Sequence, residues 1–485
     1  MKNNSVRLAR ATIVQSIFIL TIGTGIELYL QNDLLHFDAQ VSTFYFIYLL
    51  NQQYRLYFEK PILRSIDHNA FFSIQFHFFE EILPIASEGG FLPSKLSVGV
   101  IFGGRSGEHE VSLVSAQSII KALNPDTYRV IPIGISRDGR WYSGTDVLNK
   151  FKKGVYPQNH RVILPAEPML SSIFPWKNGE IDKQGKIELD VIIIAMHGPY
   201  GEDGKLQGLL DYADIPYVGA GVLGSALSMD KVFQKQICSA LPVPGTDFLW
   251  MYHTDWLEDR QGNRPVLEKQ LGNSSRKEMI EKIFQVLKSP FFVKPSNLGS
   301  SVGISKAYDY HTLSDAIEAA FRFDHKIIIE KAVHPVREFE VSILGNAHPR
   351  ASVVGEVIPS NEFYDYDAKY IDNASKLCIP ADISPELTAK IQQAAIQTFL
   401  CVGAEGMARV DFLYNPGSKE LFINEINTIP GFTNISMFSK LWQASGLTYG
   451  ALLDELIQLA LQRAEQTRNL QSSYTPKKDW YREEP

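Results

Sequence analysis

One stretch near the C-terminus decides the fold: Glu420-Leu421-Phe422-Ile423-Asn424-Glu425-Ile426-Asn427-Thr428-Ile429-Pro430-Gly431-Phe432-Thr433. It predicts a buried strand that ends in a Pro-Gly turn. Because alternate side chains of a strand point to the same face, Glu425 and Asn427 are expected to face one site. The preceding stretch Met407-Ala408-Arg409-Val410-Asp411-Phe412 places Arg409 and Asp411 on one face in the same way. Oxygen ligands of this kind suit Mg²⁺ held against phosphates.

A simpler interpretation of the same two strands is a salt-bridged sheet edge. In that arrangement Arg409 neutralises Asp411 and Glu425 without any ligand. Structural ion pairs are common, so these two strands alone do not decide between the interpretations. Other segments have to do so.

Length and composition describe an ordinary globular protein. With 485 residues, the chain can form two to four domains of about 100 to 200 residues each. Its residues are 45% hydrophobic and 21% charged. The net charge of -7 and the pI near 5.9 give no basic surface for nucleic acid, so we expect no nucleic-acid partner. Any phosphate ligand has to be met by local groups.

The three cysteines are Cys238, Cys378 and Cys401. Three cysteines cannot all pair within one chain, and none has the Cys-x-x-Cys or Cys/His spacing of a metal site. We therefore expect three reduced, small buried residues and a cytoplasmic location.

The first 95 residues differ from the rest of the chain. Residues 11–30 are almost entirely apolar and follow Lys2, Arg7 and Arg10, so a membrane anchor is one interpretation. Glu27 and the Gly23-Thr24-Gly25 break argue against it. We favour a start codon assigned too early, with the functional protein beginning between Leu92 and Leu96. An additional packed segment is the third alternative.

From Leu96 onward, apolar strands alternate with helical patterns. This alternation predicts a parallel, doubly wound sheet, whose ligands bind at the carboxyl ends of the strands. Two polar loops, residues 105–110 and 197–203, follow such ends. The predicted strands are residues 97–102, 129–135 and 190–196, and residues 111–123 and 208–213 are the predicted helical segments.

A second unit begins near Met229 and contains a strand that carries a lysine, Pro290-Phe291-Phe292-Val293-Lys294-Pro295. The loop Ser296-Asn297-Leu298-Gly299-Ser300-Ser301-Val302-Gly303 follows it. A lysine beside a run of backbone N–H groups and hydroxyls can hold a triphosphate. The alternative is a flexible hairpin with a solvated lysine. The spacing differs from that of the Walker P-loop.

Six segments together resemble the D-alanine-D-alanine ligases of the ATP-grasp superfamily, in the same order and over about residues 96–461. Two are the lysine strand with its loop and the pair of acidic strands described above. The others are Phe102-Gly103-Gly104-Arg105-Ser106-Gly107-Glu108-His109-Glu110-Val111-Ser112, His197-Gly198-Pro199-Tyr200-Gly201-Glu202-Asp203-Gly204, Met229-Asp230-Lys231, and Tyr364-Asp365-Tyr366-Asp367-Ala368-Lys369-Tyr370.

The resemblance implies an α/β fold, a three-domain ATP-grasp ligase with an N-terminal doubly wound parallel-sheet domain. The expected boundaries are an extension at 1–95, a substrate-binding α/β domain at 96–228, a central ATP-grasp subdomain at 229–337, a C-terminal subdomain with the metal site at 338–463, and a tail at 464–485. It further implies a cytoplasmic homodimer that joins two D-alanines for peptidoglycan precursors, using ATP and two Mg²⁺ or Mn²⁺ ions. We expect no membrane partner.

The family's site residues transfer to matching positions of this chain as follows. The resemblance assigns Lys231, Lys294, Lys369 and Ser301 to the ATP phosphates, Glu330, Lys331 and Val333 to the adenine slot, and Glu338 to the ribose. It assigns Asp411, Glu425 and Asn427 to the metal ions. It assigns the binding of the first D-alanine to Glu110, Ser300, Tyr370 and His197. It assigns stabilisation of the oxyanion to Arg409 and Gly431, and binding of the second substrate's carboxylate to Ser436 and Met437.

Residues 362–372 are implied to form a lid over ATP, although an ordinary surface loop is the alternative. Tyr370 in this lid favours a D-alanine acceptor over the D-Ala-D-Lac or D-Ala-D-Ser ligases of the vancomycin-resistance type, which are the closest competitors. A catalytically inactive nucleotide-binding protein is disfavoured by the retained lysines and acids. A nicotinamide-dependent oxidoreductase is disfavoured because Gly103-Gly104 lacks the G-x-G-x-x-G spacing.

Overall fold

The structure is a computed structural model of the 485-residue chain. It describes residues 17–22, 25–30, 33–37, 95–257, 269–272, 274–358, 376–433, 436–471 and 473–474. The predicted lid at 362–372, with Lys369 and Tyr370, lies outside the described residues. The chain forms two compact units, Met1–Pro93 and Ser94–Pro485.

The first unit contains a three-stranded antiparallel sheet. Its strands are β1 (Ile17–Ile22), β2 (Gly25–Leu30) and β3 (Asp33–Phe37), with Ile22 opposite Gly25 at the first turn. The described part of the apolar run is therefore two strands rather than one helix. Over the described residues, we find no helix with the length and apolar character needed to cross a membrane.

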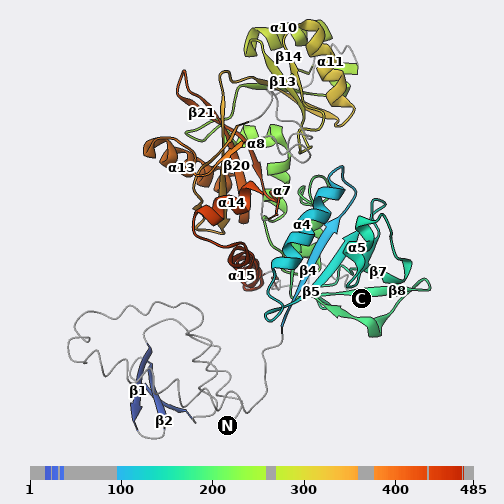
Figure 1. The fold of residues 1–485 in the computed structure, drawn as a ribbon, viewed down its shortest axis with the longest axis vertical. Coiled ribbons are helices and arrows are strands. Elements are labelled where there is room, and N and C mark those ends of the chain that lie inside the picture. Colours follow the sequence, from blue (N-terminus) through green and yellow to red (C-terminus); the bar gives the residue numbers. More distant parts are fainter. Residues whose placement is uncertain are drawn as a thin grey trace, which may run out of the picture. The chain divides into compact units, whose positions relative to one another are not determined.

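The second unit begins with a mixed sheet in the order β10-β8-β7-β6-β5-β4-β11. Its parallel centre consists of β4 (Leu96–Gly103), β5 (Tyr128–Ile135) and β11 (Val191–Ile194). Figure 1 shows helix α4 (His109–Ala122) beside β4 and helix α5 (Val147–Lys152) beside β5. The other strands are β6 (Trp141–Ser143), β7 (Arg161–Ile163), β8 (Ser172–Lys177), β9 (Glu180–Ile181) and β10 (Ile187–Glu188).

The predicted parallel pairing is confirmed for the three strands expected from the sequence, β4, β5 and β11. The sheet also has an antiparallel side that was not predicted. Strands β5 to β8 pair antiparallel in succession. The physical reason is the short connection after β5, a tight turn in which Ser136 N donates to Arg140 O at 2.9 Å. Parallel neighbours need a long crossover, whereas antiparallel strands can follow one another through such a turn.

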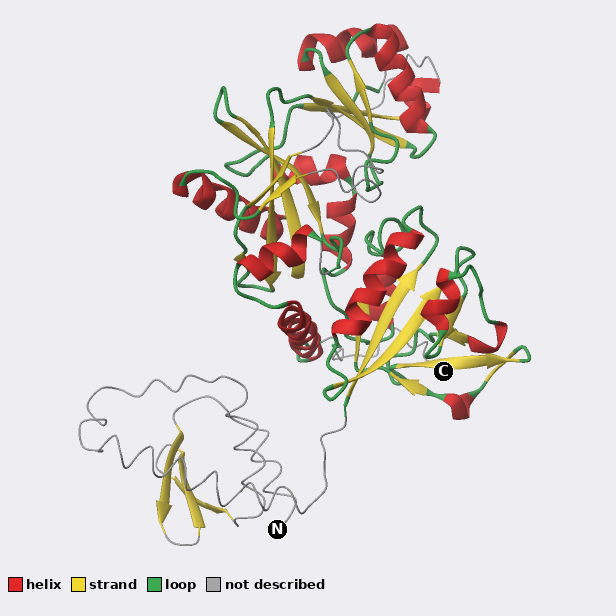
Figure 2. Cartoon of the chain, viewed as in Figure 1, coloured by secondary structure: helices red, strands yellow, loops and turns green. Residues whose placement is uncertain are grey.

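The second sheet of this unit has the order β12-β15-β13-β14 and is antiparallel. Its strands are β12 (Phe248–Tyr252), β13 (Phe291–Pro295), β14 (Ser305–Ala307) and β15 (Lys326–Lys331). Helices α10 (Arg276–Leu287) and α11 (Tyr310–Phe321) share one buried hydrophobic core with these strands (Figure 2). Both helices begin with a capping box, Ser275 with Glu278 and Asp309 with Thr312.

Three shorter helices accompany this part of the chain. They are α7 (Val222–Met229), α8 (Lys231–Cys238) and α9 (His253–Leu257). Asp230 forms the N-cap of α8, since its side chain accepts hydrogen bonds from the backbone of Val232 and Phe233.

The third sheet has the order β19-β18-β16-β20-β21 and is also antiparallel. Its strands are β16 (Arg337–Gly345), β18 (Gly355–Ile358), β19 (Lys376–Cys378), β20 (Gly406–Asn415) and β21 (Glu420–Asn427), and β17 (Arg350–Ala351) pairs with β16. Its helices are α13 (Pro385–Cys401) and α14 (Met437–Ala444).

The C-terminal helix α15 (Tyr449–Arg468) returns to the first sheet. Its residues Leu452 and Leu456 belong to the same hydrophobic core as β4, β5 and β11. Tyr128 on β5 donates to Asp454 at 2.8 Å, and Arg463 Nη2 donates to Tyr217 O at 2.9 Å. The last helix therefore connects the first and third sheets.

Candidate active site

Strands β20 and β21 hold the acidic residues on one face. Arg409 lies opposite Asn427 and Asp411 lies opposite Glu425 in the strand register. Asn427 Nδ2 donates to Asp411 Oδ2 at 3.2 Å. The prediction that these four side chains share one face of two neighbouring strands is confirmed.

Arg409 is held by two carboxylates. Its Nε and Nη2 donate to the two oxygens of Asp411, each at 2.7 Å, and Nε lies 2.9 Å from Glu340 Oε2. Burial alone would lower the pKa of Arg409, but Asp411 and Glu340 raise it well above its usual value. The Arg409–Asp411 ion pair of the simpler interpretation is therefore present, and Glu340, which was not predicted, also pairs with Arg409.

Among the described residues of this face, carboxylates outnumber cations. The carboxylates are Glu340, Asp411 and Glu425, and the nearby cations are Arg409 and Lys231, whose Nζ lies 3.9 Å from Glu425 Oε2. Two carboxylates and the Asn427 amide offer the hard oxygen donors that Mg²⁺ prefers. No group of three His, Cys, Asp or Glu side chains with metal-binding spacing occurs in the described part of the chain. A divalent ion here would need its remaining ligands from phosphate oxygens or water.

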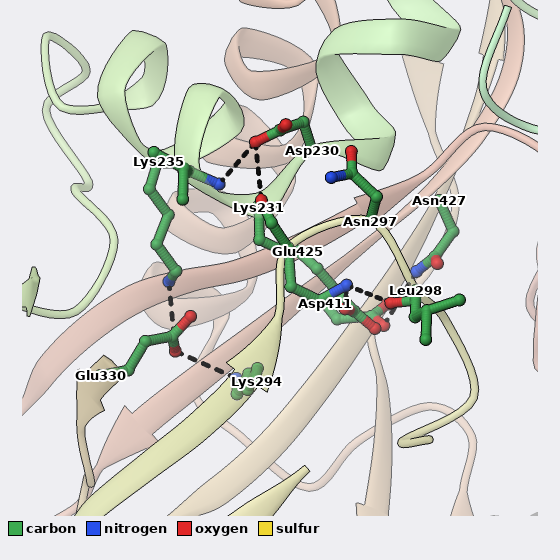
Figure 3. A network of polar contacts seen from close by, with 12 residues as sticks. Asp230, Lys231, Lys235, Lys294, Asn297, Leu298, Glu330, Asp411, Glu425 and Asn427 are labelled. Atoms are coloured by element: carbon green, nitrogen blue, oxygen red, sulfur yellow. Dashed lines mark hydrogen bonds and ion pairs between the residues drawn. The ribbon is translucent and has the colours of Figure 1, made fainter. Parts of the chain in front are cut away.

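Helix α8 brings Lys231 to this face from the neighbouring segment, as Figure 3 shows. Lys231 Nζ donates to Leu298 O at 2.6 Å, and Lys231 N donates to Ser296 O at 3.0 Å. Asp230 accepts from Ser296 Oγ at 2.8 Å and pairs with Lys326 at 2.5 Å. These hydrogen bonds connect the start of α8 to the glycine- and serine-rich loop that follows Lys294.

A second ionic cluster lies at Glu330 on β15. Lys294 Nζ lies 3.0 Å and Lys235 Nζ 3.6 Å from Glu330 Oε2 (Figure 3). Burial by itself would raise the pKa of Glu330, but Lys235 and Lys294 lower it. The predicted phosphate lysine Lys294 therefore contacts the predicted adenine residue Glu330. Lys235 was not predicted as a site residue. The spacing Lys231-x-x-x-Lys235 is the signal for it, because residues four apart lie on the same face of a helix.

The loop that follows Lys294 contacts the loop between β4 and α4 through Ser300. Ser300 and Ser301 both have left-handed backbone, with φ of 52° and 58°. Ser300 Oγ donates a hydrogen bond to Glu108 Oε1. A Cβ atom on Gly198 would lie 2.5 Å from Glu108 Oε2, and the φ of 73° at Gly198 also favours glycine beside Glu108.

Glu110 does not occupy the position predicted for it. Its side chain is 65% exposed and pairs with Arg137 at 2.5 Å. Helix α4 begins at His109, so Glu110 points away from the side on which Glu108 meets the loop. The partner of Ser300 is Glu108, and the prediction for Glu110 is corrected accordingly.

His197 is buried between three segments. Its Nε2 lies 2.8 Å from Ser115 Oγ, and its Nδ1 lies 3.2 Å from Ile429 O and 3.4 Å from Glu202 Oε1. Burial alone would lower the pKa of His197, but Glu202, with help from Glu108, raises it. His197 thus joins the first sheet's helix α4 to the turn that follows β21.

The turn after β21 leads into helix α14. Ser436 is the N-cap residue of α14, and Met437 is its first residue. Ser436 Oγ accepts from Thr433 N at 3.1 Å, and a Cβ atom on Gly431 would lie 3.4 Å from the same oxygen. The structure therefore places Gly431 close to Ser436 at the start of α14.

The remaining predicted residues are Glu338, Lys331 and Val333. Glu338 lies on β16 two residues before Glu340 and so on the same face. Lys331 ends β15 with an exposed side chain, and Val333 follows half-buried.

A cavity lies where these segments meet. It is lined by Glu202, Ser228, Met229, Lys231, Leu298, Gly299, Glu425, Ile426, Asn427 and Thr428. These residues come from the loop after β11, the α7–α8 segment, the loop after β13 and strand β21.

Two family models match the chain that carries this site. The model described as D-ala D-ala ligase N-terminus matches residues 97–220, and the model described as D-ala D-ala ligase C-terminus matches residues 262–458. The chain belongs to the D-alanine-D-alanine ligase family. The prediction of this family and of its ATP-grasp fold is confirmed.

Relatives in the family match nearly their whole length. The chain is 46% identical to the D-alanine-D-alanine ligase of Natranaerobius thermophilus over 373 residues, which cover 77% of this chain and 96% of that protein. It is 44% identical to the ligase of Heliobacterium modesticaldum over 376 residues, covering 77% of this chain and 97% of that protein.

Solved structures of the family agree with the fold. The D-Ala:D-Ser ligase VanG from Enterococcus faecalis has a TM-score of 0.64 and 32% identity, covering 76% of this chain and 100% of that one. The D-alanine-D-alanine ligase from Coxiella burnetii has a TM-score of 0.61 and 32% identity, covering 77% and 97%.

Proposed function

We propose that this enzyme joins two D-alanine molecules to D-alanyl-D-alanine for peptidoglycan precursors, using ATP and an acyl-phosphate intermediate. The observation that carries the proposal is the meeting of the acidic strands, the lysine-bearing helix α8 and the phosphate loop at one cavity. Such a site can hold a triphosphate, a divalent ion and a small substrate together.

ATP is the substrate that best matches the cationic side of the site. Lys231 and Lys294, with Lys369 from the segment outside the described residues, would meet its phosphates, and the backbone around Ser301 would supply N–H donors. Glu330 Oε1 is buried and has no hydrogen-bond partner among the described groups, which suits a base with an amino group. Lys331 and Val333 would flank that base, and Glu338 would bind the ribose.

Asp411, Glu425 and Asn427 would hold two Mg²⁺ or Mn²⁺ ions, with Glu425 between them. These ions supply positive charge that offsets the developing charge on the phosphoryl oxygens. The position of the three oxygen-bearing side chains on one face of two neighbouring strands supports the assignment.

Glu108 would accept the ammonium group of the first D-alanine, in place of Glu110. Ser300, which already donates to Glu108, and Tyr370 would complete this group, and His197 would help to place the substrate. The carboxylate of the first D-alanine then attacks the γ-phosphorus of ATP, the bond to the β-phosphate breaks, ADP leaves and an acyl phosphate forms.

The amine of the second D-alanine attacks the acyl-phosphate carbonyl. Arg409 and the Gly431 N–H would stabilise the oxyanion that forms, and phosphate leaves as the peptide bond closes. Ser436 and the Met437 N–H at the start of α14 would bind the carboxylate of the second D-alanine, because N–H groups at a helix N-terminus favour anions.

A D-alanine-D-serine ligase is the second candidate, favoured by the similarity to VanG. Tyr370 in the lid supports D-alanine as acceptor instead. We further propose a cytoplasmic homodimer.

Product analysis tests the function. The purified enzyme with ATP, Mg²⁺ and D-alanine should release ADP, phosphate and D-alanyl-D-alanine in equal amounts. In competition with D-serine or D-lactate at equal concentration, the D-alanine dipeptide should dominate. A majority of D-alanyl-D-serine would establish the second candidate, and ATP hydrolysis without any dipeptide would contradict both.

A further inference from the structure

Lys235 is a fully buried lysine next to the nucleotide site. It lies one helical turn after Lys231 on α8, and its side chain is 1% exposed. Its Nζ has Thr246 Oγ1 at 3.3 Å, Ile423 O at 3.5 Å and Glu330 Oε2 at 3.6 Å. Burying an ammonium group is unfavourable unless it is paired, so these contacts account for its presence.

The two oxygens of Glu330 have different surroundings. Oε2 faces Lys235, Lys294 and the hydroxyl of Thr246, which donates at 3.4 Å. Oε1 is buried and lacks a hydrogen-bond partner among the described residues. Since the cations and the hydroxyl all lie at Oε2, they fix the orientation of the carboxylate and leave Oε1 for a donor from outside the protein.

Charge explains why a lysine is needed at this place. The charged groups that face Glu330 are Lys235 from α8, Lys294 from β13 and, further away, Lys231. Burial alone would favour a neutral carboxyl group, which could donate as well as accept. An ionised carboxylate only accepts hydrogen bonds.

We propose that Lys235 is a positioning residue that keeps Glu330 a charged acceptor, so that Glu330 Oε1 selects a purine with an amino group at position 6. Lys235 itself does not touch the nucleotide. This inference rests on the proposed function, because it takes ATP as the substrate. A 6-oxo purine would present a lone pair to Oε1 and is disfavoured by repulsion.

The test compares ATP with ITP, which has an oxygen at position 6. The measured quantity is kcat/KM for each nucleotide with D-alanine in excess. The wild-type enzyme should prefer ATP strongly. Lys235→Met keeps the length of the side chain and removes its charge, and should reduce the ATP preference by about tenfold, mostly through KM for ATP.

Two further variants separate positioning from packing. Thr246→Val removes only the hydroxyl beside Glu330 Oε2 and should reduce the preference by about threefold, even if Lys235→Met does not fold. Lys326→Met is the matched control, since Lys326 is another buried lysine and lies on the same strand as Glu330, but pairs with Asp230. Whatever it does to turnover, it should keep the wild-type ratio.

The outcomes are distinct. An unchanged ATP-to-ITP ratio in both Lys235→Met and Thr246→Val, with KM raised equally for both nucleotides, would overturn the positioning role. A wild-type enzyme that makes the dipeptide equally well from ATP and ITP would overturn it too, while leaving the ligase function intact. A wild-type enzyme that makes no dipeptide would instead contradict the proposed function.

Discussion

Strands β20 and β21 and the cluster around Glu330 both combine carboxylates with cations, but their charge balance is opposite. On the strands, Glu340, Asp411 and Glu425 outnumber Arg409 and Lys231. In the cluster, Lys235 and Lys294 outnumber Glu330. The Glu425 side chain is 26% exposed, whereas those of Glu330 and Lys235 are 3% and 1% exposed.

This difference indicates what each region can bind. A face with excess negative charge beside a cavity suits a cation, and the cluster with excess positive charge suits the anionic nucleotide. Because the Glu425 side chain is partly exposed, water can offset part of the charge on the strands. The stability of the cluster around Glu330 depends on the ion pairs of Glu330 with Lys235 and Lys294, since an uncompensated buried charge is strongly destabilising.

The largest effect on ligation is expected for Glu425→Gln on the acidic face of β20 and β21. It removes one metal-binding charge and should lower ligation by about a thousandfold or more, or about 4 kcal/mol of transition-state stabilisation. Stability should be unchanged or slightly higher, because Asp411 loses a carboxylate neighbour across the strand pair. Glu420→Gln on the same strand, at an exposed position, is the control and should keep activity. Near-normal turnover of Glu425→Gln would remove the metal assignment.

For the cluster around Glu330, Glu330→Gln is expected to lower stability. It leaves two buried lysines without their carboxylate and should lower the free energy of unfolding by about 3 to 5 kcal/mol in urea titrations. Glu281→Gln at the exposed pair with Lys277 should leave unfolding nearly unchanged. If both variants unfold alike, Glu330 and its lysines do not form a stabilising cluster.

Glu108→Gln and Glu110→Gln compare two carboxylates that lie two residues apart in the sequence, one at the site and one exposed. The first removes the carboxylate that contacts Ser300 and should raise KM for the first D-alanine by about tenfold to a hundredfold. The second removes an exposed partner of Arg137 and should leave KM within about twofold of wild type. The reverse ranking in initial-rate measurements would restore Glu110 to the site.

Glu202→Gln should change how stability depends on pH. Glu202 is the main group that raises the pKa of His197 above 6.5 against the effect of burial, with Glu108 as a second carboxylate. A raised folded-state pKa gives stability that is present below pH 6.5 and is lost as the pH rises through that pKa. This loss of stability should be absent in Glu202→Gln. Urea unfolding at several pH values between about 5.5 and 8 measures it, with Glu110→Gln as control, and equal slopes would contradict the coupling.

The smallest effect is expected for the first unit. A shortened chain that begins at Leu92 should keep full activity, because every residue of the candidate site lies in the second unit. Initial rates and thermal unfolding of the two chains should agree. Loss of activity or solubility would show that residues 1–91 pack against the enzyme or tether it.

Local rules explain what could be predicted of the site. Alternation along a strand places Arg409 with Asp411 and Glu425 with Asn427, and the register pairs them as expected. The order of six motifs is enough to identify the family from the sequence alone. The antiparallel side of the first sheet was missed, because the apolar pattern of a strand does not reveal the direction of its neighbour.

The sequence by itself determined the family, the faces of its strands and the lysines and acids available for chemistry, because these follow from residue order and short-range geometry. Only the tertiary structure decided that Glu108 rather than Glu110 meets Ser300, since that depends on the residue at which α4 begins. It also decided that Lys235 and Lys294 share Glu330. Contacts between segments far apart in sequence arise from packing of the whole chain and leave no local signal that could predict them.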